Sequence, residues 1–261
     1  MSKYLILGDL HCRSVWKDIV AKEGDSSDRI IFLGDYLPPR HDVQLEDPTD
    51  ACGFLYDVLD FKDKNPNKVV LLRGNHDCQV LGYSWAECYP KAHPKVEAYC
   101  RTNDVKNWFL NNTQWVYRIP NTNIVCSHAG IGNYFLDSVC KYFKSKDGWD
   151  FNIYDTDQLI NHINEIPPCE LFAFNGGWWD TNGDSATQPC TWIRPETLIN
   201  NAIEDVIQVI GHTPVSHIAN LRDAIIKYDS ETNCPNLWCC DCLENRECLI
   251  IEDGIFKPCK I

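Results

Sequence analysis

The feature that most constrains the fold is a short apolar run that occurs three times, followed each time by glycine and then by polar residues. The three stretches are YLILGDLH (4–11), RIIFLGDY (29–36) and KVVLLRGNHD (68–77). Short apolar runs rich in β-branched residues predict buried strands. Residues 47–66 carry apolar side chains at helical spacing and end at Asn65-Pro66, which predicts a helix. Strands that alternate with helices predict an α/β fold.

The rest of the chain continues as one unit. Residues 95–112 are expected to be helical and to precede two strands, TQWVYRIP and TNIVCSHAG. Residues 132–205 are expected to be mostly helical, and DVIQVIGHTP (205–214) to form a further strand. The C-terminal stretch from 223 onward predicts successive antiparallel strands. Because no repeat, low-complexity segment or linker interrupts the chain, residues 1–261 are predicted to form a single domain.

The composition limits the class of protein. With 261 residues, 44% of them hydrophobic, the chain can bury a sizeable core. Its formal net charge of −13 is not that of a nucleic-acid-binding protein, so no nucleic-acid partner is expected. No apolar run is long enough to cross a membrane, and no secretory signal is evident. The 15 cysteines, an odd number, are therefore expected to be reduced thiols in a cytoplasmic protein without a membrane partner.

Oxygen and imidazole side chains stand at the ends of the predicted strands. They are Asp9, His11, Asp35, Asn75, His76, His128 and His212. In open α/β sheets, ligands bind at the edge where the carboxyl ends of the strands meet. These residue types suit divalent manganese, iron or zinc, and six ligands among the seven suit two ions that share a bridging carboxylate. Each motif alone is more often a turn or a structural histidine, so the prediction depends on all of them together.

In this order, the motifs GDLH, GDY, GNHD, SHAG and GHTP resemble those of the calcineurin-like metallophosphoesterase superfamily. Within it, the chain is most similar to the phosphoprotein (Ser/Thr) phosphatase family, over about residues 4–219. In GHTP, Pro214 stands where the nuclease branch has a second metal-binding histidine, which favours the phosphatase branch. The resemblance implies a four-layer α/β fold, in which a central β-sandwich of two mixed sheets is flanked by helices.

The resemblance also implies two divalent metal ions, manganese before iron or zinc. The first ion would be held by Asp9, His11 and Asp35. The second would be held by Asp35 as the bridge, together with Asn75, His128 and His212. Together the ions would lower the pKa of a bridging water, so that hydroxide could attack phosphorus in line near neutral pH.

Further residues acquire roles in the same way. His76 would be the general acid that protonates the leaving oxygen. Arg194, in TWIRPETL, would bind the phosphoryl group together with Asn75. Arg73 matches a family arginine too, but its place at the end of a strand favours a structural or outer role.

The second motif departs from the family pattern. The family reads GD-x-V-D-R-G, whereas this chain reads GDYLPPR (34–40). Pro38 stands where an aspartate orients the acidic histidine, and Pro39 where an arginine binds phosphate. Arg40, one residue later, is the candidate substitute for that arginine. The metal ligands are thus complete, while residues around them are altered.

Three functions remain open. The first is a metal-dependent hydrolase of phosphomonoesters, acting on phosphoserine or phosphothreonine. The second is a hydrolase of dinucleoside polyphosphates such as diadenosine tetraphosphate, with a base stacked on Trp178, Trp179 or Trp192. The partner would be a phosphoprotein in the first case and a nucleotide in the second. The third is a non-catalytic binding protein that has kept the fold. Retention of every candidate ligand favours an enzyme.

Overall fold

The computed structural model describes residues 2–38, 48–82, 93–148, 155–171, 174, 180, 183–203, 205–221 and 236–261. The strands are β1 (Lys3–Leu7), β2 (Arg29–Phe32), β3 (Val69–Leu72), β4 (Thr113–Gln114), β5 (Val116–Arg118), β6 (Ile124–Ser127), β7 (Ile207–Ile210), β8 (Ala219–Asn220), β9 (Asn236–Cys239), β10 (Glu247–Glu252) and β11 (Ile255–Lys260). The helices are α1 (Val15–Ile19), α2 (Pro48–Lys64), α3 (Cys78–Leu81), α4 (Pro94–Thr102), α5 (Val105–Asn112), α6 (Asn133–Asp147), α7 (Thr156–Glu165), α8 (Pro168–Leu171) and α9 (Pro195–Leu198). A π-helix, η1 (Val20–Gly24), and a 3₁₀ helix, η2 (Leu243–Asn245), complete the described elements.

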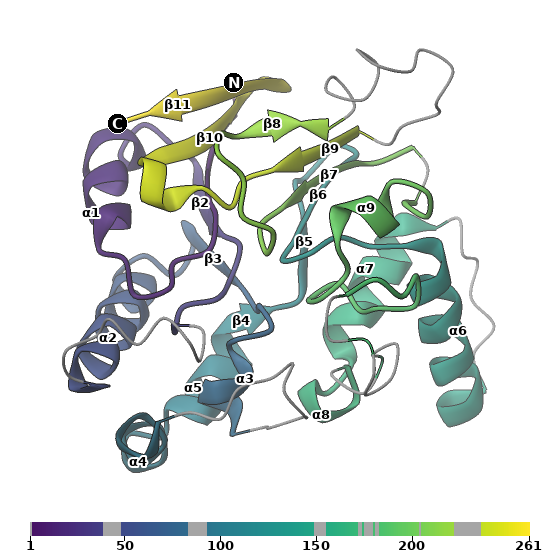
Figure 1. The fold of residues 1–261 in the computed structure, drawn as a ribbon, viewed down its shortest axis with the longest axis horizontal. Coiled ribbons are helices and arrows are strands. Elements are labelled where there is room, and N and C mark those ends of the chain that lie inside the picture. Colours follow the sequence, from purple (N-terminus) through teal and green to yellow (C-terminus); the bar gives the residue numbers. More distant parts are fainter. Residues whose placement is uncertain are drawn as a thin grey trace.

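The described strands form two mixed sheets. The first has the order β11-β10-β1-β2-β3-β4, in which β1 to β4 are parallel and β10 and β11 are antiparallel. The second has the order β5-β6-β7-β9-β8, with β6, β7 and β9 parallel and the two edge strands antiparallel. Figure 1 shows α1 and α2 on one side of the strands and α6, α7 and α9 on the other. The predicted α/β class, with two mixed sheets flanked by helices, is confirmed.

The alternation of side chains along each strand explains the layers. Ile6 belongs to the buried cluster between the sheets, which also contains Val209 of the second sheet. Its neighbours Leu5 and Leu7 point to the opposite face and join a larger cluster with Trp16 of α1. Because strands such as β1 are buried on both faces, they are apolar at nearly every position. This is why the sequence shows them as continuous apolar runs.

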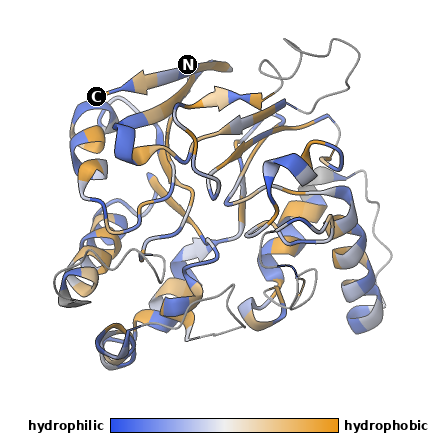
Figure 2. Cartoon of the chain, viewed as in Figure 1, coloured by the Kyte–Doolittle hydropathy of each residue, from blue (hydrophilic) through white to orange (hydrophobic). Residues whose placement is uncertain are grey.

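The outer face of the second sheet is covered in the same way. Ile210 of β7 and Leu237 of β9 form a third buried cluster with Leu198 of α9. Figure 2 shows that the strands are largely hydrophobic, whereas the helices carry both hydrophobic and hydrophilic residues. None of the helices in the described ranges combines the length and the apolar character that crossing a bilayer requires.

The structure differs from the predicted elements in two details. Residues 95–112 are helical as predicted, but they form two helices, α4 and α5, separated by Asn103 and by Asp104, which has a left-handed backbone (φ 53°). Of the C-terminal strands, β10 and β11 are antiparallel as predicted, but β9 runs parallel to β7. A parallel neighbour needs a crossover of about a dozen residues or more, and 211–235 provides it. Part of that segment, 222–235, lies outside the described residues.

The chain crosses from the first sheet to the second at Trp115, between β4 and β5. Trp115 is fully buried, and its Nε1 donates a hydrogen bond to the carbonyl of Ile166 (3.0 Å). The side-chain oxygen of Asn164 on α7 accepts hydrogen bonds from the backbone N–H groups of Trp115 (2.8 Å) and Val116 (3.0 Å). Its amide nitrogen donates to the carbonyl of Val116 (2.9 Å). Helix α7 therefore satisfies the backbone where it leaves one sheet for the other.

Replacing Asn164 with alanine is expected to lower the free energy of unfolding by about 1–3 kcal/mol, because buried backbone N–H groups lose their acceptor. Urea denaturation followed by circular dichroism measures this change. Asn107→Ala is the matched control, since the exposed Asn107 side chain donates a hydrogen bond to the exposed Asp104, and it should change the free energy by less than about 0.5 kcal/mol. Equal effects of the two substitutions would contradict the assignment.

Candidate metal centre

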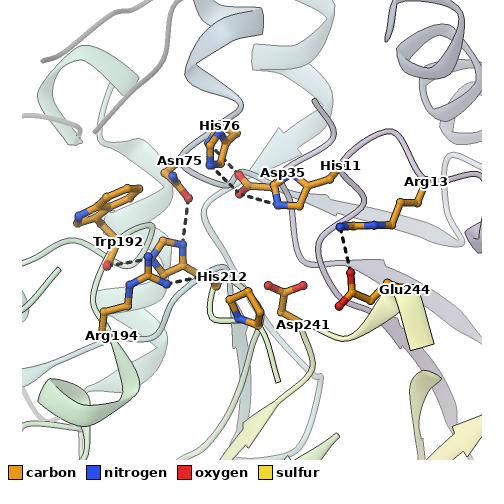
Figure 3. Close-up of a pocket in the computed structure, with 11 residues that line it drawn as sticks. His11, Arg13, Asp35, Asn75, His76, Trp192, Arg194, His212, Asp241 and Glu244 are labelled. Carbon is orange, nitrogen blue, oxygen red and sulfur yellow. Dashed lines mark hydrogen bonds and ion pairs between the residues drawn. The ribbon is translucent and has the colours of Figure 1, made fainter. Parts of the chain in front are cut away.

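The six predicted metal ligands come together at one edge of the two sheets. Asp9 and His11 follow β1, Asp35 follows β2, Asn75 follows β3, His128 follows β6 and His212 follows β7. Because β1 to β3 run parallel in one sheet, and β6 and β7 run parallel in the other, their carboxyl ends meet at this edge. Several of these side chains line a cavity of about 330 Å³, drawn in Figure 3.

The backbone is unusual at three of these positions. His11 (φ 42°), Asp35 (φ 51°) and His212 (φ 64°) have left-handed backbones, which cost energy for residues other than glycine. Glycines beside other ligands allow the segments to approach closely. A Cβ at Gly74 would overlap the Asp35 carboxylate, and a Cβ at Gly211 would overlap the Asp9 carboxylate. The glycines of the sequence motifs are thus required by close approach.

The first group of ligands consists of Asp9, His11 and Asp35, whose donor atoms all lie within 4.8 Å of one another. The Nε2 atom of His11 is 3.8 Å from a carboxylate oxygen of Asp9 and 3.8 Å from one of Asp35. Its Nδ1 lies 3.0 Å from the carbonyl of Leu37 and must carry the proton to bond there. In the neutral ring, Nε2 therefore directs a lone pair at two carboxylates, as a metal-binding histidine does.

The second group is centred on the side-chain oxygen of Asn75. It lies 2.9 Å from Nε2 of His128 and 3.0 Å from Nδ1 of His212. The other nitrogens of these two rings face backbone carbonyls, that of Leu33 (2.8 Å) and that of Trp192 (3.0 Å). When both rings are neutral, two lone pairs therefore point at an oxygen that can only accept.

This arrangement fits a cation better than a network of hydrogen bonds. The amide nitrogen of Asn75 is buried and has no hydrogen-bond partner among the described residues. Rotating the amide by half a turn would place that nitrogen between the two imidazoles and satisfy all three groups. A divalent cation among the oxygen and the ring nitrogens explains why the oxygen faces inward. Carboxylate, amide and imidazole donors together suit such an ion.

The charge balance agrees with a cation site. Burial, with the nearby Asp241 carboxylate, raises the pKa of Asp9 well above its usual range. Burial alone would lower the pKa of His128, but the carboxylates of Asp35 and Asp9 raise it to about 10. Burial would raise the pKa of Asp35, yet the surrounding imidazoles, His128 first, hold it below its usual range. Buried carboxylates of this kind require positive charge close by.

Asp77 is a residue of the site that the sequence prediction did not single out. Its carboxylate accepts hydrogen bonds from the backbone N–H groups of Asp35 (3.0 Å), Tyr36 (3.0 Å) and Gly74 (2.7 Å). It is fully buried and joins the segment after β2 to the segment after β3. The sequence signal for this role was the aspartate of GNHD, because a carboxylate in a buried motif needs several hydrogen-bond donors.

Asp241 is a second residue that the prediction missed. It follows β9 and lines the cavity. The prediction of antiparallel C-terminal strands concealed it, because only a β9 parallel to β7 brings its carboxyl end to the same edge as His212. The available signal was an aspartate directly after the apolar stretch LWCC (237–240), comparable to the aspartates that follow apolar strands in the motifs of Asp9 and Asp35.

His76, the predicted acid, lines the cavity with its ring beside that of His11 (5.3 Å between centroids). Its Nε2 lies 3.9 Å from a carboxylate oxygen of Asp35. Its Nδ1 is buried and has no hydrogen-bond partner in the described part of the chain. This agrees with the replacement of the usual aspartate by Pro38. Burial lowers the pKa of His76 to about 4.

Arg194, the predicted phosphate-binding residue, also lines the cavity. Its Nη1 donates to the carbonyl of His212 (3.0 Å) and to Oγ1 of Thr213 (3.0 Å), which fixes the guanidinium beside the second ligand group. At the other side of the cavity, Arg13 forms an ion pair with Glu244 (3.4 Å; Figure 3).

The remaining predicted residues lie elsewhere. Arg40, Trp178 and Trp179 fall outside the described residues. Arg73 is buried, donates hydrogen bonds to Thr113 and Leu110, and lies over the ring of Trp115. That position matches the structural role considered for Arg73.

Replacing Gly211 with alanine is expected to displace the Asp9 carboxylate and to abolish most of the rise in melting temperature that Mn²⁺ gives the metal-free protein. Gly53→Ala, on the exposed face of α2 with nothing near the new Cβ, is the control. It should keep the full Mn²⁺ effect and stabilise the helix by about 0.5–1 kcal/mol. Differential scanning fluorimetry with and without Mn²⁺ measures both. If Gly211→Ala keeps the full rise in melting temperature with Mn²⁺, the close approach of Gly211 to the Asp9 carboxylate is not required for metal binding.

Comparison with known proteins identifies a family. The model of the calcineurin-like phosphoesterase family matches residues 2–235. No curated protein matches the sequence. A solved cold-active protein-tyrosine phosphatase of a psychrophilic Shewanella species has 15% sequence identity and a TM-score of 0.55, over 99% of this chain and 77% of that chain. A metallophosphoesterase from Sphaerobacter thermophilus has 13% identity and a TM-score of 0.44, over 99% and 88% of the two chains. At 15% identity, the likeness to the first structure concerns the fold alone.

Proposed function

Because the chain belongs to the calcineurin-like phosphoesterase family, whose members hydrolyse phosphoesters with the help of metal ions, we propose that it is a phosphomonoesterase that acts on phosphoserine or phosphothreonine in proteins. The observation that carries the proposal is the inward-facing oxygen of Asn75, which lies 2.9 Å from Nε2 of His128 and 3.0 Å from Nδ1 of His212 beside the cavity. An arginine, Arg194, stands beside it.

We propose that two divalent ions, manganese by preference, occupy the two ligand groups and share Asp35. When bound, such ions polarise a phosphoryl oxygen and supply a nucleophile derived from water near neutral pH. The chain's own part is to hold the donors in place. Backbone carbonyls orient the imidazoles, and Asp77 fixes the segment that carries Asp35.

The phosphoryl group would be oriented by Arg194. A guanidinium suits this role because it stays protonated and presents several N–H groups in one plane. Its hydrogen bonds to His212 and Thr213 restrict its motion, so little conformational freedom is lost when substrate binds. His76 would stand on the leaving-group side, where the negative charge of a bound phosphoryl group raises its pKa, and would then donate a proton to the departing oxygen.

One observation favours a phosphomonoester over a dinucleoside polyphosphate. Trp192 is the one tryptophan, of the three considered for base stacking, that lies in the described part of the chain. It is only 7% exposed and packs against the ring of His212 (5.0 Å between centroids). Little of its ring is therefore open to a nucleotide base.

The thiols support the proposed reducing, cytoplasmic setting. The cysteines in the described ranges are all free, among them Cys239, Cys240 and Cys242, which are buried with apolar neighbours. Free cysteines packed in this way behave as small hydrophobic residues.

The proposed function predicts that a phosphoserine peptide is hydrolysed in the presence of Mn²⁺. Treatment with a strong chelator should lower turnover about 100-fold or more, because a bound ion supplies several kcal/mol of transition-state stabilisation. Asp35→Asn should lower it similarly in excess Mn²⁺, whereas Asp57→Asn, at an exposed ion pair with Lys17, should not. Phosphate release from the peptide and from diadenosine tetraphosphate, measured side by side, tests the substrate class. Faster turnover of the dinucleotide would overturn the proposal.

The role of His76 predicts a dependence on the leaving group. His76→Asn should lower kcat for an alkyl phosphoester by about 100-fold or more, since the departing alkoxide then goes unprotonated. For p-nitrophenyl phosphate, whose leaving group needs little protonation, the loss should be much smaller. Steady-state kinetics on the two substrates gives the comparison. Equal losses on both would mean that His76 supports the site without donating a proton.

A further inference from the structure

Asp241 is a buried carboxylate for which the proposed mechanism has no use. The residue is 7% exposed, and Figure 3 shows its carboxylate directed into the cavity, between Arg194 on one side and Arg13 on the other. Its backbone is held in place, because its carbonyl accepts a hydrogen bond from the N–H of Val215 (2.9 Å). The preceding residue, Cys240, donates its own N–H to the carbonyl of Ile210 at the end of β7 (2.8 Å).

Within the described part of the chain, no group donates a hydrogen bond to this carboxylate or forms an ion pair with it. Arg13, a cation of the cavity wall, forms its ion pair with Glu244 instead. A buried carboxylate without a hydrogen-bond donor or an ion-pair partner is costly. Burial raises the pKa of Asp241, and the negative charge of Asp35 adds to the rise. The more distant His11, His128 and Arg13 offset only part of it.

We propose that Asp241 is a positioning residue of the metal centre, and that it binds a water molecule coordinated to the ion held by Asp9, His11 and Asp35. This inference rests on the proposed metal-dependent function. The donor atoms of those three residues lie within 4.8 Å of one another, and Asp241 does not meet that criterion with them. Its carboxylate therefore lies outside this group of donor atoms. A water molecule between ion and carboxylate would fill the gap and give the carboxylate its missing donor.

The proposal predicts that Asp241→Asn is favourable in the metal-free protein and unfavourable in the metal-bound protein. Without metal, the substitution removes an unpaired buried charge, so the melting temperature should be equal to or higher than that of the unmodified protein. With metal, it weakens the hold on a coordinated water, and Mn²⁺ affinity should fall about 10–100-fold. A residue that only supports the fold would lower the melting temperature in both states.

Isothermal titration calorimetry of the chelator-treated full chain with Mn²⁺ measures the affinity, and thermal melts in chelator and in excess Mn²⁺ measure the two stabilities. Glu244→Gln is the matched control. It removes the same charge from the same cavity, but at an exposed carboxylate paired with Arg13, and should change Mn²⁺ affinity less than about threefold.

An Asp241→Asn protein that binds Mn²⁺ as the unmodified protein does would overturn the inference and leave the proposed function standing. A lower melting temperature in chelator would overturn it too, as would a failure of both Asp241→Asn and Asp241→Ala to fold, since each outcome makes the residue structural. If the unmodified protein binds no Mn²⁺, the proposed function fails and this inference fails with it.

Discussion

Three backbone carbonyls determine what the site can bind. Those of Leu37, Leu33 and Trp192 each face one ring nitrogen of a histidine, so that the other nitrogen of the ring keeps its lone pair. The first two carbonyls lie in the segment that leaves β2. The direction of the imidazoles, and with it the chemistry of the cavity, is therefore set by the path of the main chain. Side chains alone would not hold it.

The same architecture concentrates negative charge where water is excluded. Asp9, Asp35, Asp77 and Asp241 are all buried. Asp77 is compensated by three backbone N–H groups, and Asp9 accepts from the backbone of His212. The others depend more on imidazoles and on whatever cation the cavity holds. A fold that buries acids in this way gains stability from the ion it binds, since binding lowers the free energy of the native state alone.

The sequence predicted which side chains meet at the edge of the sheets, because each of them follows an apolar strand directly and strands buried on both faces are easy to recognise. Asp241 was missed for a physical reason. The direction of β9 depends on the path of the long connection from β7, and no local sequence pattern predicts that path. Asp77 stands in the GNHD motif, but the sequence could not reveal its role because its hydrogen-bond partners are backbone N–H groups. The break between α4 and α5 depends on one backbone angle at Asp104. Such features belong to the tertiary structure and not to any short stretch of residues.

The ligands are divided between the two sheets. Asp9, His11, Asp35 and Asn75 extend from the first sheet, and His128 and His212 from the second. A cation bound to Asn75, His128 and His212 would add a cross-link between sheets that the chain joins at Trp115 and again between β9 and β10. The donor set is complete only once the sheets have docked. Metal binding would then mark the last step of folding. A chain whose sheets have not yet docked would bind no cation at this site and would be inactive.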